Sequence, residues 1–546
     1  MLRSFGSATA LALLVVGCGG GGSGGGGSLT TYSIGGTVTG LTGSGLVLQT
    51  NAGDVVPVSA PGAFTFANHL ADGTPYRVFV KTQPSSPAQN CVVTNGTGFV
   101  GTANVTNVDV TCASGYTVGG TASGLVGSGL TLAICSPIQY PTQHGPGCPT
   151  HDELQIAANG AFTLNSDKLP GYPGGYDYDL IIITHQPSSP TQRCVISNSK
   201  VTLQNANDNS VTVSCATFLY VTNAADNTLS AYNVDANTGA LTAIGTLTAT
   251  GVSPHAILGI ENNYPDPDDK RYVYVGNEDS NDISAFAVND TTGALTAVPG
   301  SPFAAGTDPQ AMASDGSSLY VANAGSDNVY VYNIDVNTGT LAKPSTFATG
   351  KNPTSIVLGG SNSDFFYVAN HGGSNDISAF RYQDLMPVSG SPFPAGGNPL
   401  SLAFGAGGKF LYSANPDATN PSISGFSIDP ISGVLSPLSG SPFPLPVSHY
   451  MASDGAYLYV TSGATIVGYA IDATTGALTA LAGFPVSVGV DAYSITIDPT
   501  NQLLYVTDAG AAHVSGFTLG ASTGALTPIP GSPSPAGNHP QFIATF

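Results

Sequence analysis

The 546-residue chain contains no tryptophan, few charged residues and very few basic ones. Charged residues make up 8% of the sequence, with 12 Lys and Arg against 33 Asp and Glu, which gives a formal net charge of −21. An acidic surface repels phosphate backbones, so the composition argues against nucleic acid as a partner. The absence of tryptophan excludes repeats that are built on a Trp-Asp dipeptide.

The sequence also lacks the short motifs of common cofactor and metal sites. It has no Gly-x-Ser-x-Gly turn, phosphate-binding loop or haem motif, and no Cys or His cluster with the spacing of metal ligands. Turns such as DANTG (235–239) lack the alternating oxygen ligands and terminal Glu of an EF-hand, and their glycine suits a hairpin loop. We therefore expect neither a metal nor a cofactor.

Glycine is abundant, at 70 residues, and a phrase recurs seven times between Phe218 and Phe546. One copy reads LYVANAGSDNVYVYNIDVNTGTLA (319–342), and it contains strand-sized pieces separated by Gly, Asn and Asp. Seven units with a period near 46 residues and four strands each predict an all-β fold, a seven-bladed β-propeller. One tyrosine fixes the register of each copy: Tyr220, Tyr274, Tyr320, Tyr367, Tyr412, Tyr459 and Tyr505.

The two ends of the repeat array predict how the ring closes. The array opens at FLYVTN (218–223), which is already the second type of strand in the unit. It ends at PQFIATF (540–546), which is a lone strand of the first type. We expect the last strand to complete the first blade, so that no sheet edge stays free inside the ring.

The N-terminal segment has the pattern of an export signal. Arg3 precedes the apolar run ALALLVV (10–16), which is too short to span a bilayer, and VVGC (15–18) resembles a bacterial lipobox. The resemblance implies a signal peptide over 1–18 and a lipid anchor at Cys18, with Gly19 permitting export to the outer membrane. The alternative is an ordinary signal peptide with an accidental cysteine. Residues 19–29 form a Gly/Ser tether.

Six further cysteines lie in two copies of a smaller internal repeat. GGTVTGLTGSGLVL (35–48) recurs as GGTASGLVGSGLTL (119–132), which predicts two homologous modules at 30–113 and 114–216, before a propeller at 217–546. Their alternating short runs predict small β-sandwiches, of immunoglobulin-like or prealbumin-like type, that act as a spacer. In an exported protein we expect disulfides within the modules, pairing Cys91 with Cys112, Cys194 with Cys215, and Cys135 with Cys148 across an insertion.

The large repeats resemble the seven-bladed lactonase family, which includes bacterial 6-phosphogluconolactonase, and the YncE-like propellers that share its repeat. The residues that carry the resemblance are LYVTN with TGALT (219–242), SPF with DP (301–309), and SPHAI (253–257). The resemblance implies the propeller fold, and it leaves the activity open because one fold serves many functions.

In propellers of this kind a ligand site usually lies at one mouth of the central channel, where the innermost strands begin. Aligning the repeats gives one residue per blade: His255, Gln310, Thr354, Leu400, His449, Tyr493 and Gln541. Further polar residues stand close to these positions: Asn223, Glu278, Asp308, Asn323, Asn352, Asn370, His371, Asn398, Asp491, Asn538 and His539. They suggest a polar funnel for a small hydroxylated ligand. Alternatively, loop ends favour Asn, Asp and His for backbone reasons.

Two functions remain open from the sequence. A phosphosugar lactonase needs Arg or Lys at the mouth, and of the six basic residues in the propeller only Lys351 adjoins a predicted mouth position. The first hypothesis is an envelope-anchored, monomeric, non-catalytic propeller that binds a small ligand or an envelope partner. The second is a hydrolase of non-phosphorylated lactones, with His255, His449 or His371 as general base.

Overall fold

The structure is a computed structural model of the chain, and every regular element among its described residues is a β-strand. The described residues are 30–85, 89–114, 118–133, 153–164, 176–179, 183–185, 187, 194–198, 200–203, 208–261, 270–359, 364–417, 420–445, 450–498, 500 and 502–545. They divide into two compact units, one containing the described residues up to 114 and the other those from 118 onward. No helix in the described ranges is long and apolar enough to cross a membrane.

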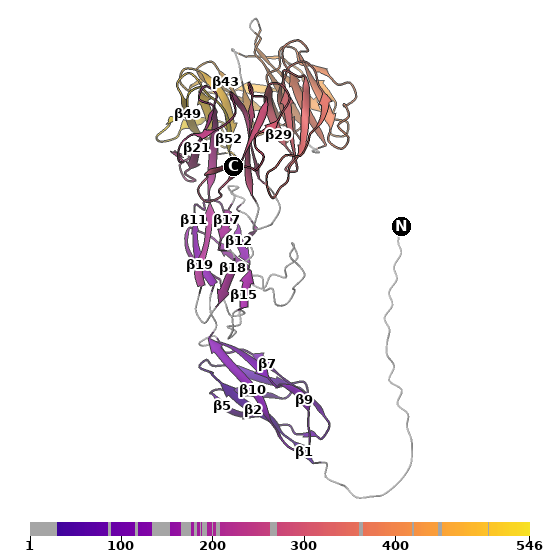
Figure 1. Cartoon of the computed structure of the whole chain (residues 1–546), viewed down its shortest axis with the longest axis vertical. Helices are drawn as coiled ribbons and strands as arrows, with labels where there is room; N and C mark the ends of the chain where they lie inside the picture. The colour runs from indigo at the N-terminus through magenta and orange to yellow at the C-terminus, as the bar shows by residue number, and fades with distance from the viewer. Residues whose placement is uncertain are drawn as a thin grey trace, which may run out of the picture. The chain divides into compact units, whose positions relative to one another are not determined.

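The first unit has two four-stranded sheets that share one core (Figure 1). The sheets have the orders β5-β2-β10-β8 and β4-β3-β7-β9, and a short pair joins β1 to β6. Val38 and Val110 of the first sheet and Leu48 and Val78 of the second belong to one buried cluster. The strands are β1 (Thr31–Tyr32), β2 (Ile34–Thr39), β3 (Leu46–Thr50), β4 (Val55–Val58), β5 (Gly62–Thr65), β6 (Leu70–Ala71), β7 (Pro75–Thr82), β8 (Gln89–Thr94), β9 (Thr97–Phe99) and β10 (Val105–Ser114).

The second unit begins with a module that repeats this topology. Its main sheet, β14-β11-β19-β17, matches the order β5-β2-β10-β8, and β11 runs parallel to β19 as β2 runs parallel to β10. The strands are β11 (Val118–Ser123), β12 (Leu130–Ala133), β13 (Glu153–Ile156), β14 (Gly160–Leu164), β15 (Tyr176–Asp179), β16 (Ile183–His185), β17 (Cys194–Ser197), β18 (Lys200–Leu203) and β19 (Asp208–Cys215). The internal sequence repeat therefore corresponds to a repeated sheet.

The Gly-Gly pair at the start of each repeat has a packing reason. A Cβ atom on Gly36 would lie 1.7 Å from the carbonyl oxygen of Val108, and one on Gly120 would lie 1.8 Å from that of Val211. Any side chain at these positions would push apart the parallel strand pair. The same close approach in both modules explains why GGT recurs.

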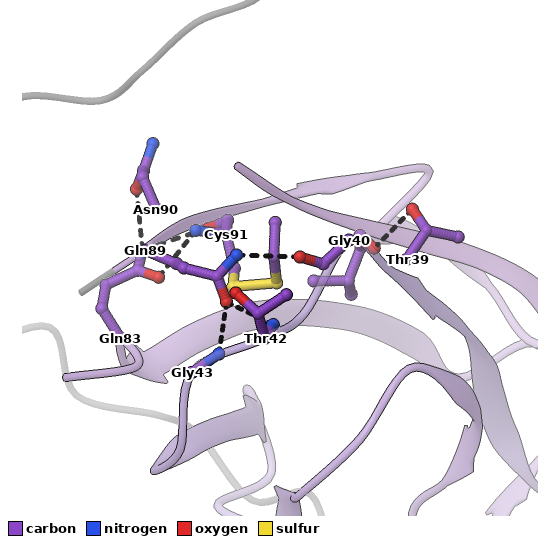
Figure 2. Close-up of a disulfide and its surroundings, with 10 residues drawn as sticks. Thr39, Gly40, Thr42, Gly43, Gln83, Gln89, Asn90 and Cys91 are labelled. Atoms are coloured by element: carbon purple, nitrogen blue, oxygen red, sulfur yellow. Dashed lines mark hydrogen bonds between the residues drawn. A yellow bond between two sulfur atoms is a disulfide. The ribbon is translucent and has the colours of Figure 1, made fainter. Parts of the chain in front are cut away.

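Two of the predicted disulfides are present. Cys91 lies opposite Cys112 across β8 and β10, and Cys194 lies opposite Cys215 across β17 and β19. Each closes a loop of about 20 residues, which stabilises a small module by about 3 kcal/mol. Beside the first bridge, the Gln89 side chain bonds the backbone of Gly40, Thr42 and Gly43 (Figure 2). Cys18, Cys135 and Cys148 lie outside the described residues.

The rest of the second unit forms seven sheets of four or five strands, as the repeat predicts. From β20 onward, the colours in Figure 1 run from magenta to yellow. The second strands of the blades are β20 (Thr217–Asn223), β25 (Arg271–Asn277), β30 (Ser318–Asn323), β34 (Phe365–Asn370), β38 (Phe410–Asn415), β43 (Tyr457–Ser462) and β48 (Leu503–Asp508). The innermost strands are β52 (Pro540–Thr545), β24 (Pro254–Glu261), β29 (Pro309–Ser314), β33 (Pro353–Leu358), β37 (Ser401–Gly405), β42 (Met451–Ser453) and β47 (Ala492–Ile497).

The third and outer strands complete each blade. The third strands are β21 (Thr228–Val234), β26 (Asp282–Val288), β31 (Asn328–Asn333), β35 (Asp376–Arg381), β39 (Ser422–Ile428), β44 (Thr465–Ile471) and β49 (His513–Leu519). The outer strands are β22 (Leu241–Ala243), β23 (Thr248–Ala249), β27 (Leu295–Ala297), β28 (Phe303–Ala304), β32 (Ser345–Ala348), β36 (Phe393–Pro394), β40 (Leu435–Pro437), β41 (Phe443–Pro444), β45 (Leu478–Ala480), β46 (Val486–Ser487), β50 (Leu526–Pro528) and β51 (Ser534–Pro535).

The ring closes as the sequence predicts. The last strand, β52, pairs antiparallel with β20, so that Tyr220 lies opposite Ala544 and Val221 opposite Ile543. The same strand also contacts β47 of the seventh blade and β24 of the second. The first blade is therefore built from both ends of the array.

Neighbouring blades are joined by a repeated hydrogen bond, which we call the tyrosine latch. The hydroxyl of the register tyrosine donates to the carbonyl oxygen of the turn glycine in the next blade, at 2.7–3.0 Å. These glycines have φ between +66° and +75°, a conformation that favours glycine. The pairs are Tyr220–Gly293, Tyr274–Gly339, Tyr367–Gly433, Tyr412–Gly476, Tyr459–Gly524 and Tyr505–Gly239.

Candidate functional site

We call the end of the ring where the innermost strands begin the mouth. The second strands end there in a repeated polar residue, which is Asn in the first five blades and is fully buried. Each asparagine donates to a side chain of the third strand of its own blade at 2.9–3.0 Å. Asn223, Asn323 and Asn370, which the sequence places near the mouth, therefore hold the blade together.

His255, the predicted mouth residue of the second blade, is 4% exposed. Its Nδ1 lies 3.2 Å from the carbonyl oxygen of Gln310 in the next blade, so Nδ1 carries the proton. Nε2 is then an acceptor, and the Tyr493 hydroxyl lies 3.4 Å from it. Burial lowers the pKa of His255 to about 4, so the ring is neutral at neutral pH.

Three rings from three other blades meet around Phe542 of the first blade. The ring centroid of Phe542 lies 4.5 Å from that of His255, 4.8 Å from Tyr450 and 5.9 Å from Tyr493. Tyr450 and Tyr493 are 5.2 Å apart. We call His255, Tyr450, Tyr493 and Phe542 the mouth cluster. Tyr493 and Phe542 are partly exposed, whereas His255 and Tyr450 are buried.

Tyr450 and Phe542 were not among the residues expected from the sequence. Each follows a predicted mouth position by one residue. The strand register puts small residues at the same place in the other five blades: Ala256, Ala311, Ser355, Ser401 and Ser494. The signal was present in the sequence, as two large aromatics in a column of Ala and Ser.

The hydroxyl groups of the mouth cluster form a chain. Tyr450 donates to Tyr493, and Tyr493 lies within reach of the acceptor nitrogen of His255. Burial, with a smaller effect from the charge of Glu278, raises the pKa of both tyrosines, so both hydroxyls stay protonated at neutral pH. This hydrogen-bonded series ends at the carbonyl oxygen of Gln310, which can only accept. Each group before it therefore donates its proton toward Gln310.

Two half-buried carboxyl groups lie near this chain of hydrogen-bonded hydroxyl groups. Burial, followed by the charges of Asp308 and Asp279, raises the pKa of Glu278, and burial also raises the pKa of Asp308. The Nε2 atom of Gln310 donates to Asp308 at 2.5 Å. The mouth therefore combines aromatic rings with carboxylates that lack their full hydration.

Gln541 leaves one acceptor unused. Its side chain is 8% exposed, and its Nε2 lies 3.5 Å from Nδ1 of His539. Its Oε1 is buried and has no hydrogen-bond partner. A buried carbonyl oxygen without a donor is costly, so a donor supplied by a ligand would satisfy this oxygen.

The other predicted residues lie outside the mouth cluster. The Thr354 hydroxyl bonds the carbonyl oxygens of Pro399 and Leu400 in the next blade, which is a structural role. Leu400 packs against the cluster. His371 is half-buried with an unbonded Nδ1, and it shares no described hydrogen bond or ring contact with the cluster. His449 lies outside the described residues.

Basic side chains are almost absent from the mouth. Lys351 is exposed there, and its Nζ pairs with Asp327 at 2.6 Å. Arg271 begins β25 and Arg381 ends β35, so both lie at the edge opposite the mouth, and Lys270 bonds the backbone of Asn337. The described residues contain no cluster of side chains suited to a metal ion.

Comparisons with known proteins agree with the propeller. A family described as a seven-bladed β-propeller lactonase matches residues 190–307 and 266–358. A 6-phosphogluconolactonase from Pectobacterium carotovorum is 28% identical over 138 residues, which is 25% of this chain and only 41% of that relative.

Solved structures match over the whole propeller. Proposed 6-phosphogluconolactonases from Bacteroides fragilis and Bacteroides uniformis both superpose with a TM-score of 0.51 at 19% identity. Each match covers 61% of this chain, and it covers 98% and 99% of the two structures respectively. At this identity the likeness establishes the fold alone. The propeller of this chain is thus a lactonase-like seven-bladed β-propeller, as the resemblance of its repeats to that family predicted.

Proposed function

We propose that the propeller binds a small, hydroxylated, non-phosphorylated ligand at the mouth cluster. The unpartnered Oε1 of Gln541 is the observation that carries this proposal, because this residue directly precedes Phe542 of the mouth cluster and its side chain is buried. Partly exposed rings of Tyr493 and Phe542 supply an apolar face, and Glu278 and Asp308 supply further acceptors. A few directed polar groups around aromatic surface are typical of small-molecule sites.

The charges at the mouth argue against a phosphorylated ligand. A phosphate needs Arg or Lys, preferably in a bidentate arrangement. Lys351 is held by Asp327, whereas Glu278 and Asp308 would repel a phosphate. The name of the Pectobacterium relative therefore suggests a reaction type for this chain more than a substrate.

Hydrolysis of a non-phosphorylated lactone is the second candidate, and the family match favours it. His255 is a poor general base here, because its pKa is about 4 and both of its nitrogens face protein groups. Glu278 is better suited to accept the proton of an attacking water, since its pKa is raised and its side chain is partly exposed. The water oxygen would then bond to the lactone carbonyl carbon, the ring C–O bond would break, and Glu278 would return the proton to the released ring oxygen, giving a hydroxy acid.

A lactone panel tests both candidates on the full-length chain. Acid release from glucono-δ-lactone, its 6-phosphate and γ-butyrolactone is followed at constant pH, and binding of the hydrolysed sugar acids and of free sugars is measured by calorimetry. Turnover that Glu278→Gln lowers at least 100-fold, while Asp72→Asn at an exposed carboxylate of the first unit does not, would establish hydrolysis. Binding without turnover would support the non-catalytic function, and a preference for the 6-phosphate would overturn the choice of ligand class.

We also propose that Cys18 anchors the protein in the bacterial cell envelope, at the outer membrane, with the two modules as a spacer. The lipobox-like VVGC sequence supports this. Cys18→Ser should move the protein from the membrane fraction to the soluble fraction. Equal membrane recovery of the variant and the natural chain would refute the anchor.

A further inference from the structure

We infer that the ligand at the mouth cluster carries a positively charged ammonium group beside its hydroxyl or N–H donor. This inference rests on the proposed binding function and narrows its ligand class. Three independent features lead to it: uncompensated carboxylates, accessible aromatic rings, and an unused buried acceptor.

The first feature is the balance of charge at the mouth. Glu278 and Asp308 are both partly buried, and none of their described partners is a cation. Exposed Asp279 adds a third negative charge to the same group. Lys351, the basic side chain on this face, is occupied by Asp327. Carboxylates that lose hydration without gaining a counter-ion attract a cationic ligand.

The second feature is the set of rings. The negative face of an aromatic ring attracts an ammonium group within about 6 Å, and several rings around one point strengthen the effect. Tyr493 and Phe542 are partly exposed, and their centroids are 5.9 Å apart in an edge-to-face arrangement. His255 beside them is held neutral, so it adds a ring without adding a competing positive charge.

The third feature is the unused acceptor of Gln541, which indicates that the ligand also carries a hydrogen-bond donor. Oε1 of Gln541 is more than nine-tenths buried and lacks a donor. A hydroxyl or N–H of the ligand would complete it. The combined chemistry is that of a small amino alcohol or amino sugar.

Pairs of compounds with the same shape and different charge test this directly. Choline is compared with 3,3-dimethyl-1-butanol, and glucosamine with glucose, by titration calorimetry on the full-length chain. The charged member of a pair should bind at least about 10-fold more tightly, and its advantage should shrink as salt is raised. Equal affinity within both pairs would overturn the inference and leave the binding function standing. No binding of any charged or uncharged sugar, alcohol or lactone would overturn both.

Variants separate the carboxylates from the rings. Glu278→Gln should weaken choline binding about 10-fold and leave 3,3-dimethyl-1-butanol unchanged, while Asp72→Asn, at an exposed carboxylate of the first unit, serves as the control. Tyr493→Leu should weaken choline binding, whereas Tyr493→Phe, which keeps the ring, should retain most of it. If Tyr493→Leu and Tyr493→Phe lose choline binding equally, the ring is not the recognition element. Thermal unfolding of each variant checks that the propeller remains folded.

The pH dependence provides a separate readout. Choline has a permanent charge, so any loss of its binding on acidification must come from the protein. Since the pKa values of Glu278 and Asp308 are raised, choline affinity should fall at a higher pH than for ordinary carboxyl groups. A choline affinity that stays constant from pH 7 to pH 4 would contradict a role for these carboxylates.

Discussion

The two ends of the propeller are built on opposite principles. At the end away from the mouth, the same tyrosine meets the same glycine in six of the seven blade interfaces. At the mouth, the aligned positions hold His, Gln, Thr, Leu and Tyr, and the next positions hold Ala, Ser, Tyr and Phe. The sequence repeat is regular at the positions where neighbouring blades pack against each other. It is irregular at the mouth, where the seven innermost strands begin.

The interface between the third and fourth blades lacks a tyrosine latch, and it shows what replaces this hydrogen bond. Blade 4 replaces the Thr-Gly turn with RYQDLM (381–386), so Tyr320 has no glycine carbonyl to meet. Its hydroxyl lies 3.4 Å from Asp315 instead, and its ring packs on Phe366 and Tyr382. Aromatic packing there replaces a hydrogen bond, so a blade interface can be formed in more than one way.

The largest expected effect comes from adding a methyl group at a latch glycine. In Gly476→Ala the new Cβ would lie 2.7 Å from Leu438 and 2.8 Å from Phe410, at φ +71°. We expect a loss of about 2–5 kcal/mol in the free energy of unfolding, from strain plus overpacking. Gly407→Ala is the control, since φ is +66° there and no atom lies within 4 Å, and it should cost about 1–2 kcal/mol. Equal losses in denaturant unfolding would show that the blade contact is unimportant.

The mouth should respond to acid more strongly than the latches. His255 takes up a proton below its ordinary pKa of 6.5 when unfolded, but only near pH 4 when folded. Falling pH therefore favours the unfolded chain, by roughly 3 kcal/mol over this range. His255→Gln should reduce the loss of stability between pH 7 and pH 4. Parallel stability curves for the natural chain and His255→Gln would argue against a buried neutral ring.

Removing one latch hydroxyl tests the periodic end by itself. Tyr412→Phe leaves the Gly476 carbonyl group without its donor and should cost about 1–2 kcal/mol. Tyr320→Phe removes only the long bond to Asp315 and should cost about 0.5 kcal/mol or less. The difference in thermal stability between these two variants measures the contribution of the latch hydrogen bond. If the two variants are equally stable, the repeated tyrosine acts only through packing.

The smallest expected effect is a gain in stability at the mouth. The raised pKa of Glu278 means that ionisation costs more in the folded protein, so stability decreases as pH rises above the ordinary value of 4.5. Glu278→Gln should therefore stabilise the protein at pH 7 by at most about 0.5 kcal/mol, and the gain should vanish below pH 4.5. A Glu278→Gln variant that is less stable than the natural chain at pH 7 would point to a structural role for this carboxylate.

Most of the fold could be predicted because it consists of repeated sequence units. The seven tyrosines gave the number of blades, the unmatched first and last strands gave the closure, and the doubled GGT motif gave two related modules with their two described disulfides. Six of the seven predicted mouth positions lie at or next to the start of an innermost strand, and the seventh, His449, lies outside the described residues. These features depend on local strand patterns and on counting, which a sequence carries directly.

The composition of the site was harder to predict. Thr354 and the asparagines had the right polarity, but the structure uses them to join backbones and blades. Tyr450 and Phe542 sit one residue beyond the aligned positions, so an alignment of strand starts does not select them. A bulge at the start of the innermost strands decides which of two adjacent side chains faces its neighbours across the ring, as at His255 and Ala256.

The sequence by itself determined a closed ring of seven blades, because periodicity and strand propensity are local properties. Only the tertiary structure decided that His255, Tyr450, Tyr493 and Phe542 form one cluster, since they come from four blades separated by as many as 287 residues along the chain (542 minus 255). It also decided that Gln541 keeps an unused buried acceptor. Burial and partner choice depend on the whole ring, and no single repeat contains them.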